Sequence, residues 1–344
     1  MIKKWVGYTN LQQELVEKYH TRKLNPLSAD TLEFEQELQG YGHLLMFYNF
    51  QIHSDMSAFI SGINFPPKLF IRFNSLVEME NLHLEYKKLY ELMAVFMGSD
   101  FKVDTIEVSV ESHISSPNTC VYFPTTNRTY GSDYPAFPLS RNLKFHDLPI
   151  PELPLECFNH YYQLSEDDRS MFSRYLRYQR MKSEEERFLG YFRLLESLTY
   201  KTKPYVDPEA LEELLNDSEK CILESLNGKG SNKDIKTLIS RIGRLNNSKY
   251  NTAKCIIDFY AELPSALKEG IVFENQDIQD ICTLRNDITH ANAYTIDEDK
   301  LAKYSSFTNA LLYIALLKKL GIHQESGAKV VHRLNSYHLI QKYD

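Results

Sequence analysis

The stretch Asn275-Gln-Asp-Ile-Gln-Asp-Ile-Cys-Thr-Leu-Arg-Asn-Asp-Ile-Thr-His-Ala-Asn-Ala-Tyr294 indicates the fold of the second half of the chain. Its aliphatic residues recur three or four positions apart, which gives a helix one apolar face; they are Ile278, Ile281, Leu284 and Ile288. Asn275 followed by Asp277 is typical of a helix N-terminus. We therefore predict a helix over residues 275–294.

Three polar residues on this helix are candidates for chemistry: Arg285, Asn286 and His290. Five residues advance an ideal helix by about 140° past a full turn, so Arg285 and His290 lie on different faces. Asn286 and His290 are four apart and share one face. Convergence of Arg285 and His290 therefore requires a long reach of the Arg285 stem, a helix bend, or a second copy of the helix packed against the first.

The Arg-x4-His spacing alone is not specific, because it occurs three times in the chain. Residues 141–146 precede a series of prolines that excludes a continuing helix. Residues 333–338 lie near the C-terminus, where fraying is common. Only residues 285–290 lie in a capped amphipathic helix within a series of helices.

The chain changes character at a proline-rich stretch. We expect strands within 43–53, 68–73, 102–110 and 119–123, with helices over 12–23 and 76–97, which together predict an α+β module. Beyond residue 164 we expect a helical bundle with helices over 165–181, 183–201, 207–226, 231–246, 249–263, 275–294 and 295–320. The predicted division is an N-terminal α+β sensor or regulatory domain (1–150), a Pro-rich linker (151–163), a helical bundle (164–322) and a C-terminal tail (323–344).

Two of these segments, Leu284-Arg-Asn-Asp-Ile-Thr-His-Ala-Asn292 and Glu185-Glu-Arg-Phe-Leu-Gly-Tyr-Phe-Arg-Leu-Leu-Glu-Ser-Leu198, resemble the HEPN superfamily, and more narrowly its ApeA-like branch of bacterial anti-phage defence proteins. The resemblance covers residues 164–322. It implies a metal-independent ribonuclease whose active site forms between the Arg-x4-His helices of two protomers. The segment 85–108 resembles, more weakly, the N-terminal domain that accompanies such domains. Some HEPN toxins carry a tyrosine two residues after the histidine as a modification site; Asn292 stands there in this chain.

The three polar residues suit RNA cleavage through the 2′-hydroxyl. Histidine exchanges protons near neutral pH, so His290 is our candidate base or acid. The Arg285 guanidinium is a permanent cation that can stabilise the pentavalent phosphate, and the Asn286 amide can orient phosphate or imidazole. The alternatives are structural: His290 as an ordinary hydrogen-bonded residue, and Arg285 as an ion-pair partner of Asp280 or Asp287.

A second basic group lies upstream, at Arg174, Arg177, Arg180 and Lys182. The three arginines are spaced by three, so they drift slowly around one helix face and offer a track for RNA phosphates. The alternative is a solvated face, with Tyr175 and Tyr178 packed inward between the cations.

Composition sets limits on these hypotheses. Charged residues make up 25% of the chain and hydrophobic residues 43%, as in a soluble globular protein. The net charge of −7 is not the basic charge that is typical of a nucleic-acid-binding protein. Five scattered cysteines without a Cys-x-x-Cys pair fit reduced thiols in a cytoplasm and argue against structural zinc. We find no membrane span, no secretory signal, and no need for a metal or cofactor.

From the sequence we expect a cytoplasmic endoribonuclease that acts as a toxin or anti-phage defence effector. It works as a homodimer through the HEPN domain on an RNA substrate, while the N-terminal domain senses a phage-derived or protein trigger. The alternative is a catalytically silent HEPN-like helical scaffold for RNA or protein binding.

Overall fold

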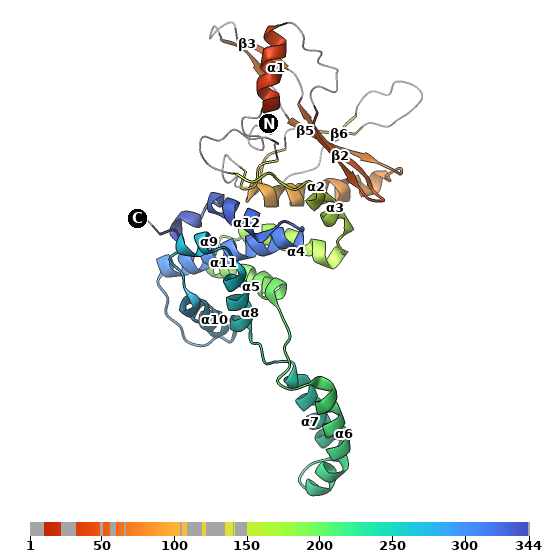
Figure 1. The fold of residues 1–344 in the computed structure, drawn as a ribbon, viewed down its shortest axis with the longest axis vertical. Helices are drawn as coiled ribbons and strands as arrows, with labels where there is room; N and C mark the ends of the chain where they lie inside the picture. The colour runs from red at the N-terminus through yellow and green to blue at the C-terminus, as the bar shows by residue number, and fades with distance from the viewer. Residues whose placement is uncertain are drawn as a thin grey trace. The chain divides into compact units, whose positions relative to one another are not determined.

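The fold was described from a computed structural model, which describes residues 10–21, 32–48, 51–55, 60–64, 67–103, 105–108, 119–121, 135–139, 141 and 150–342. The strands are β1 (Leu32–Leu38), β2 (Gly42–Tyr48), β3 (Gln51–Asp55), β4 (Ile60–Asn64), β5 (Pro67–Phe73), β6 (Ile106–Val108) and β7 (Thr119–Val121). The helices are α1 (Asn10–His20), α2 (Leu82–Met97), α3 (Glu156–Gln163), α4 (Glu166–Gln179), α5 (Glu184–Thr199), α6 (Pro208–Ser225), α7 (Asn232–Asn246), α8 (Thr252–Glu262), α9 (Ser265–Glu269), α10 (Asn275–Thr289), α11 (Glu298–Lys319) and α12 (Gln324–Val330). The predicted α+β class, strands first and helices afterwards, is confirmed (Figure 1).

The chain divides into two compact units. The first comprises Met1–Leu194, Leu263–Val272 and Ile296–Asp344, and the second comprises Leu195–Glu262 and Phe273–Thr295. Helix α5 therefore contributes its first part to one unit and its last turn to the other. Both Arg285 and His290 belong to the second unit.

In the first unit, an antiparallel sheet in the order β1-β2-β5 carries one buried face. Strand β2 alternates buried and half-buried side chains, as expected of a strand with one face against a core. Helix α3 packs on β1, where the Asn159 side chain accepts a hydrogen bond from the backbone of Gln39 at 2.9 Å. Helix α3 lies inside the stretch that we expected to be a linker. It is helical and packed because Phe158 and Tyr161 are apolar side chains buried in this unit.

Helix α11 forms the core of the same unit. Its middle is buried on nearly every side, from Leu301 to Leu317, and α12 packs against it. The predicted C-terminal tail is not frayed: Val331, Tyr337 and Ile340 are buried there. Among the described residues, no helix combines the length and apolar character that crossing a bilayer requires.

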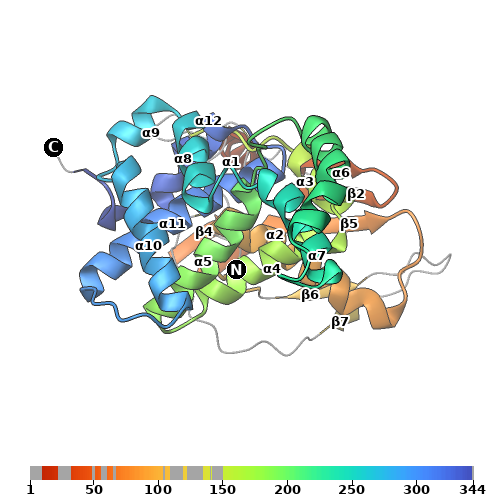
Figure 2. The same ribbon diagram turned by 90° about the horizontal axis from the view of Figure 1, so that it is seen from below.

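The second unit contains a helical hairpin, α6 and α7, together with α8 and α10, which contact each other. Figures 1 and 2 both show α6 and α7 side by side. The Asn246 side chain fastens the base of the hairpin, accepting hydrogen bonds from the backbone of Tyr205 and Val206 at 3.1 and 3.0 Å. The expected caps form here, since Asp207 accepts from the Ala210 amide and Ser231 from the Asp234 amide.

Candidate active site

The candidate site is built on α10, which begins at Asn275 as predicted, with Glu274 rather than Asn275 as its N-cap. Glu274 is the N-cap, and its backbone N–H donates to the Asp277 carboxylate at 2.7 Å. The carboxylate on the first turn also favours the positive end of the helix dipole. Ile278, Ile281 and Leu284 are buried, so the predicted apolar face is confirmed.

The helix ends at Thr289, five residues before the predicted end, with His290 as its C-cap. Ala291 adopts a left-handed conformation with φ 53°, and its N–H donates to the Ile288 carbonyl at 3.3 Å. The Asn292 N–H reaches the Asp287 carbonyl at 2.9 Å. These two bonds form the usual glycine-type helix terminator, here with an alanine in the glycine position at a cost of about 1 kcal/mol. The terminator fixes the backbone on both sides of His290.

The Arg285 guanidinium is held by a carboxylate from another helix. Its Nη2 lies 2.7 Å from Oε2 of Glu196, on the last turn of α5, and its Nη1 donates to Oδ1 of Asn286 at 3.0 Å. The other oxygen of Glu196 accepts a hydrogen bond from the Thr252 hydroxyl at 2.6 Å, at the start of α8. These contacts hold the Arg285 guanidinium against Glu196 and against the neighbouring Asn286 amide.

This ion pair is partly removed from solvent. The Arg285 and Glu196 side chains are 23% and 28% exposed, so their attraction is less screened than that of a surface pair. The two carboxylates that the sequence offered to Arg285 are engaged elsewhere: Asp280 accepts from Gln276, and Asp287 accepts from Asn292.

The other two candidate residues face solvent. Asn286 and His290 are both exposed. Within the described part of the chain, no side chain forms a hydrogen bond or ion pair with the His290 ring. The imidazole is thus open to a substrate, unlike the hydrogen-bonded structural histidine of the alternative interpretation.

One thiol on α10, that of Cys282, is weakly nucleophilic at neutral pH. Cys282 lies one turn before Arg285 on α10 and is buried. Burial, with a smaller contribution from the nearby negative charge of Glu196, raises the pKa of Cys282 to about 12, although Arg285 opposes this rise. A protonated thiol is a poor nucleophile, so Cys282 is not a catalytic group at neutral pH.

A comparison with known families identifies this part of the chain. The sequence model of the Apea-like HEPN family matches residues 189–326, from α5 into α12. Residues 189–326 form an Apea-like HEPN domain. No curated protein and no solved structure matches the chain. HEPN domains are generally ribonucleases with defence-type roles, and they typically dimerise and bind RNA.

The other two Arg-x4-His matches lie outside the HEPN helix and differ from it. Arg141 contacts Glu152 at 3.0 Å, and His146 lies outside the described residues. Arg333 is half-buried, which lowers its pKa, and the ring of His338 pairs with the Asn335 carbonyl at 3.0 Å.

The basic group on α4 precedes the match and belongs to the first unit. Arg180 forms two 2.7 Å hydrogen bonds to the buried Asp100 carboxylate, which raise the pKa of this arginine. Tyr175 and Tyr178 are buried, as the alternative interpretation predicted. Arg174, Arg177 and Lys182 are exposed. One of the four cations, Arg180, is therefore paired with a buried carboxylate, and RNA binding by this group stays a prediction.

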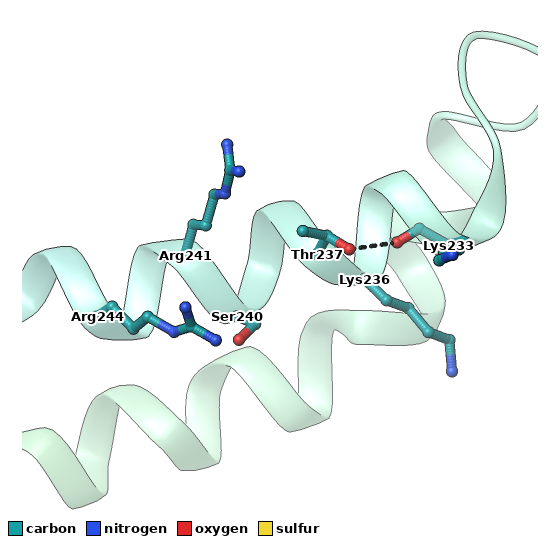
Figure 3. Close-up of a pocket in the computed structure, with 6 residues that line it drawn as sticks. All are labelled: Lys233, Lys236, Thr237, Ser240, Arg241 and Arg244. Atoms are coloured by element: carbon teal, nitrogen blue, oxygen red, sulfur yellow. Dashed lines mark hydrogen bonds between the residues drawn. The ribbon is translucent and has the colours of Figure 1, made fainter.

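Sequence reasoning missed two features of the HEPN domain. The first feature is the role of Glu196 as the ion-pair partner of Arg285. The sequence signal that could have indicated it is a carboxylate between the apolar residues Leu195 and Leu198. The second feature is a groove of about 530 Å³ along α7 (Figure 3). It is lined by Lys233, Lys236, Thr237, Ser240, Arg241 and Arg244.

Proposed function

We propose that the chain is a metal-independent endoribonuclease of the HEPN type, acting as a toxin or anti-phage defence effector. Two copies bring their α10 helices together, and the scissile phosphodiester lies between the two sets of Arg285, Asn286 and His290. The observation that carries this proposal is an exposed imidazole on the same HEPN helix as a guanidinium that Glu196 orients.

Each residue has a chemical role in this proposal. His290 of one copy accepts the proton of the RNA 2′-hydroxyl as its oxygen attacks phosphorus. His290 of the second copy donates a proton to the departing 5′-oxygen. Arg285 stabilises the charge that gathers on the phosphate oxygens, and Asn286 orients the phosphate. The products are a 2′,3′-cyclic phosphate and a 5′-hydroxyl, and DNA is not cleaved because it lacks the 2′-hydroxyl.

The ion pair also has a role. A free arginine side chain samples many rotamers, whereas Glu196 restricts Arg285 before substrate binds, which reduces the reorganisation needed in the transition state. Glu196 is therefore a positioning residue. That the N-terminal domain restrains this activity until a trigger binds stays a prediction.

The same ion pair supports a second candidate function, a catalytically silent scaffold. Glu196 offsets the Arg285 charge within one chain, so the pair can serve simply to hold α5, α8 and α10 together. Activity decides between the two functions.

The test is cleavage of RNA by the purified full chain, with and without a chelator. We expect wild type to cut in both conditions, and His290→Ala and Arg285→Ala to lose about 10³-fold in rate. His338→Ala is the matched control, since it removes an exposed histidine from another Arg-x4-His match. Sequencing of RNA ends after brief expression identifies the target. Equal cleavage by wild type and His290→Ala would contradict the assignment, and no cleavage by any protein would favour the scaffold.

A further inference from the structure

The α6–α7 hairpin separates its charges by helix. Helix α6 carries the acidic residues Glu209, Glu212, Glu213, Asp217, Glu219 and Glu224 with one lysine. Helix α7 carries Lys233, Lys236, Arg241 and Arg244 with one aspartate, Asp234, whose backbone N–H and carboxylate both bond the N-cap Ser231. The net charge of the chain is −7, so its overall composition does not account for a strongly basic face on one helix.

The four cations share one face of α7. At about 100° per residue, Lys233 to Arg244 spread over about 140° of the helix circumference and about 16 Å of its length. Ile235 and Asn246, which are buried, lie on the opposite side. The cations therefore point away from the buried side of the helix.

Three of the four cations lack a carboxylate partner among the residues that the structure describes. Lys236 pairs with Glu219 on α6 at 2.9 Å. The side chains of Lys233, Arg241 and Arg244 form no ion pair or hydrogen bond with any residue that the structure describes. Elsewhere in the same unit cations are neutralised, as in the pairs Lys201–Glu262 and Lys254–Asp258. The acidic helix α6 is in contact with α7, yet among the described residues it pairs with only one of these four cations, Lys236.

The space between these side chains suits a phosphate chain. The six lining residues form an open groove along α7 rather than a closed cavity (Figure 3). The Thr237 hydroxyl donates to the Lys233 carbonyl at 2.8 Å, whereas the Ser240 hydroxyl forms no hydrogen bond with any residue that the structure describes. Lysine, arginine, serine and threonine side chains contact the phosphates of nucleic-acid backbones without reading sequence.

We propose that the outer face of α7 binds the sugar-phosphate backbone of single-stranded RNA through Lys233, Lys236, Arg241 and Arg244. The choice of RNA rests on the function proposed above, and the surface gives that enzyme a sequence-independent hold on its substrate, apart from the cleaving groups on α10. A membrane surface is the other outcome of the test, because Leu238, Ile242 and Leu245 on the side of α7 away from the cations are exposed apolar residues.

Binding without cleavage tests this surface directly. The ligand is a fluorescent 2′-O-methyl RNA strand of about 20 nucleotides, which keeps every phosphate but lacks the attacking hydroxyl. The proteins are the wild-type full chain, Lys233→Ala/Arg241→Ala/Arg244→Ala, and a control triple variant, Lys220→Ala/Lys303→Ala/Lys342→Ala. The control removes the same charge from exposed positions off this face. Affinity is measured by anisotropy between 50 and 200 mM salt.

We expect the α7 variant to bind about tenfold or more weakly at low salt, and its slope of log K against log salt to flatten by about 2. The control should behave as wild type. A DNA strand of the same sequence should show the same dependence on α7, because the phosphates are the same. Ser240→Glu, which adds one negative charge in the groove, should weaken binding in the same direction; thermal melting verifies that each variant is folded.

The outcomes separate this inference from the proposed function. If RNA binding depends on the α7 cations but the chain cleaves no RNA, the α7 surface is supported and the proposed ribonuclease activity is contradicted. If wild type cleaves RNA and the α7 variant binds RNA with the same affinity and salt slope as wild type, only the α7 surface is contradicted. Wild type that binds anionic vesicles through α7, and no RNA strand, also overturns it.

Discussion

Two sets of cations in the second unit differ in ion pairing and in solvent exposure. On α10, Arg285 is partly buried and fixed by Glu196, with Thr252 holding the other carboxylate oxygen. On α7, Arg241 and Arg244 are exposed and have no carboxylate partner among the described residues. A cation that stabilises a transition state must lie in one geometry, so a fixed side chain makes it more effective. A cation that binds a flexible polyanion must adjust to each phosphate, so a freely rotating side chain suits it better. The difference indicates which arginine is suited to chemistry and which to attraction.

The largest expected effect comes from removing one arginine of each kind. Arg285→Ala should lower the rate of bound RNA cleavage about 10³-fold. Arg244→Ala should leave that rate unchanged and reduce the salt slope of binding by about 0.7. Single-turnover cleavage at saturating RNA and anisotropy titrations measure the two quantities. The contrast fails if both variants change the same quantity.

Thiol reactivity sharpens the contrast between the two environments. With its pKa raised to about 12 from an ordinary 9.0, Cys282 should be alkylated about 50-fold more slowly than an ordinary thiol, after allowing for the higher nucleophilicity of a more basic thiolate. Cys221, exposed on α6, should react first. The Cys282 rate should rise about tenfold for each pH unit above 8, because the thiolate fraction rises in that proportion.

Mass spectrometry of peptides after timed labelling measures both thiols. Glu196→Gln should speed labelling of Cys282 and Arg285→Ala should slow it, because the two charges act on its pKa in opposite directions. Equal labelling of Cys221 and Cys282 in the folded wild type would show that Cys282 is not shielded.

Converting the fixed arginine into a mobile one gives a smaller effect. Glu196→Gln keeps the shape and loses the charge, so Arg285 is oriented less strictly, and we expect about a tenfold lower kcat with little change in KM. Glu196→Ala should in addition lower the free energy of unfolding by about 1–3 kcal/mol, since a partly buried guanidinium loses its partner. Rates and thermal melts are the measurements; a Glu196→Gln chain with wild-type kcat would make the ion pair purely structural.

The smallest effect concerns the end of α10. Ala291→Gly relieves the left-handed alanine and should raise the free energy of unfolding by about 1 kcal/mol. Ala291→Val should lower it by more, because a β-branched residue tolerates this conformation poorly. Urea unfolding measures both, and a neutral Gly variant would show that the strain is released elsewhere.

Much of the helical half followed from local rules. The expected helices α4, α5, α6, α7 and α8 form with boundaries within a few residues, because apolar periodicity and capping residues act within one turn of the chain. The predicted end of α10 was wrong, because an alanine such as Ala291 gives no sequence signal for a left-handed backbone conformation. β1 and β4 were missed because pairing partners, rather than local alternation, decide short strands.

The candidate site was predictable only in part. Arg285, Asn286 and His290 follow from a spacing and a resemblance, but Glu196 lies 89 residues before Arg285, and no local rule links them. The same limit applies to α4, where Asp100 lies 80 residues before Arg180. Tertiary contact decides which cations are neutralised, so a basic spacing alone does not identify a binding face.

Glu196 joins three helices that are far apart in the sequence, and this has a practical consequence for anyone who trims the protein. A truncated version that starts at α6 retains the whole arginine-to-histidine segment, yet it leaves behind the acid that anchors it. Such a shortened protein would contain the whole motif but would lack the carboxylate that orients Arg285, so its inactivity would not contradict the activity proposed for the full chain. Any minimal version should therefore begin upstream of α5, whose last turn carries the anchoring acid.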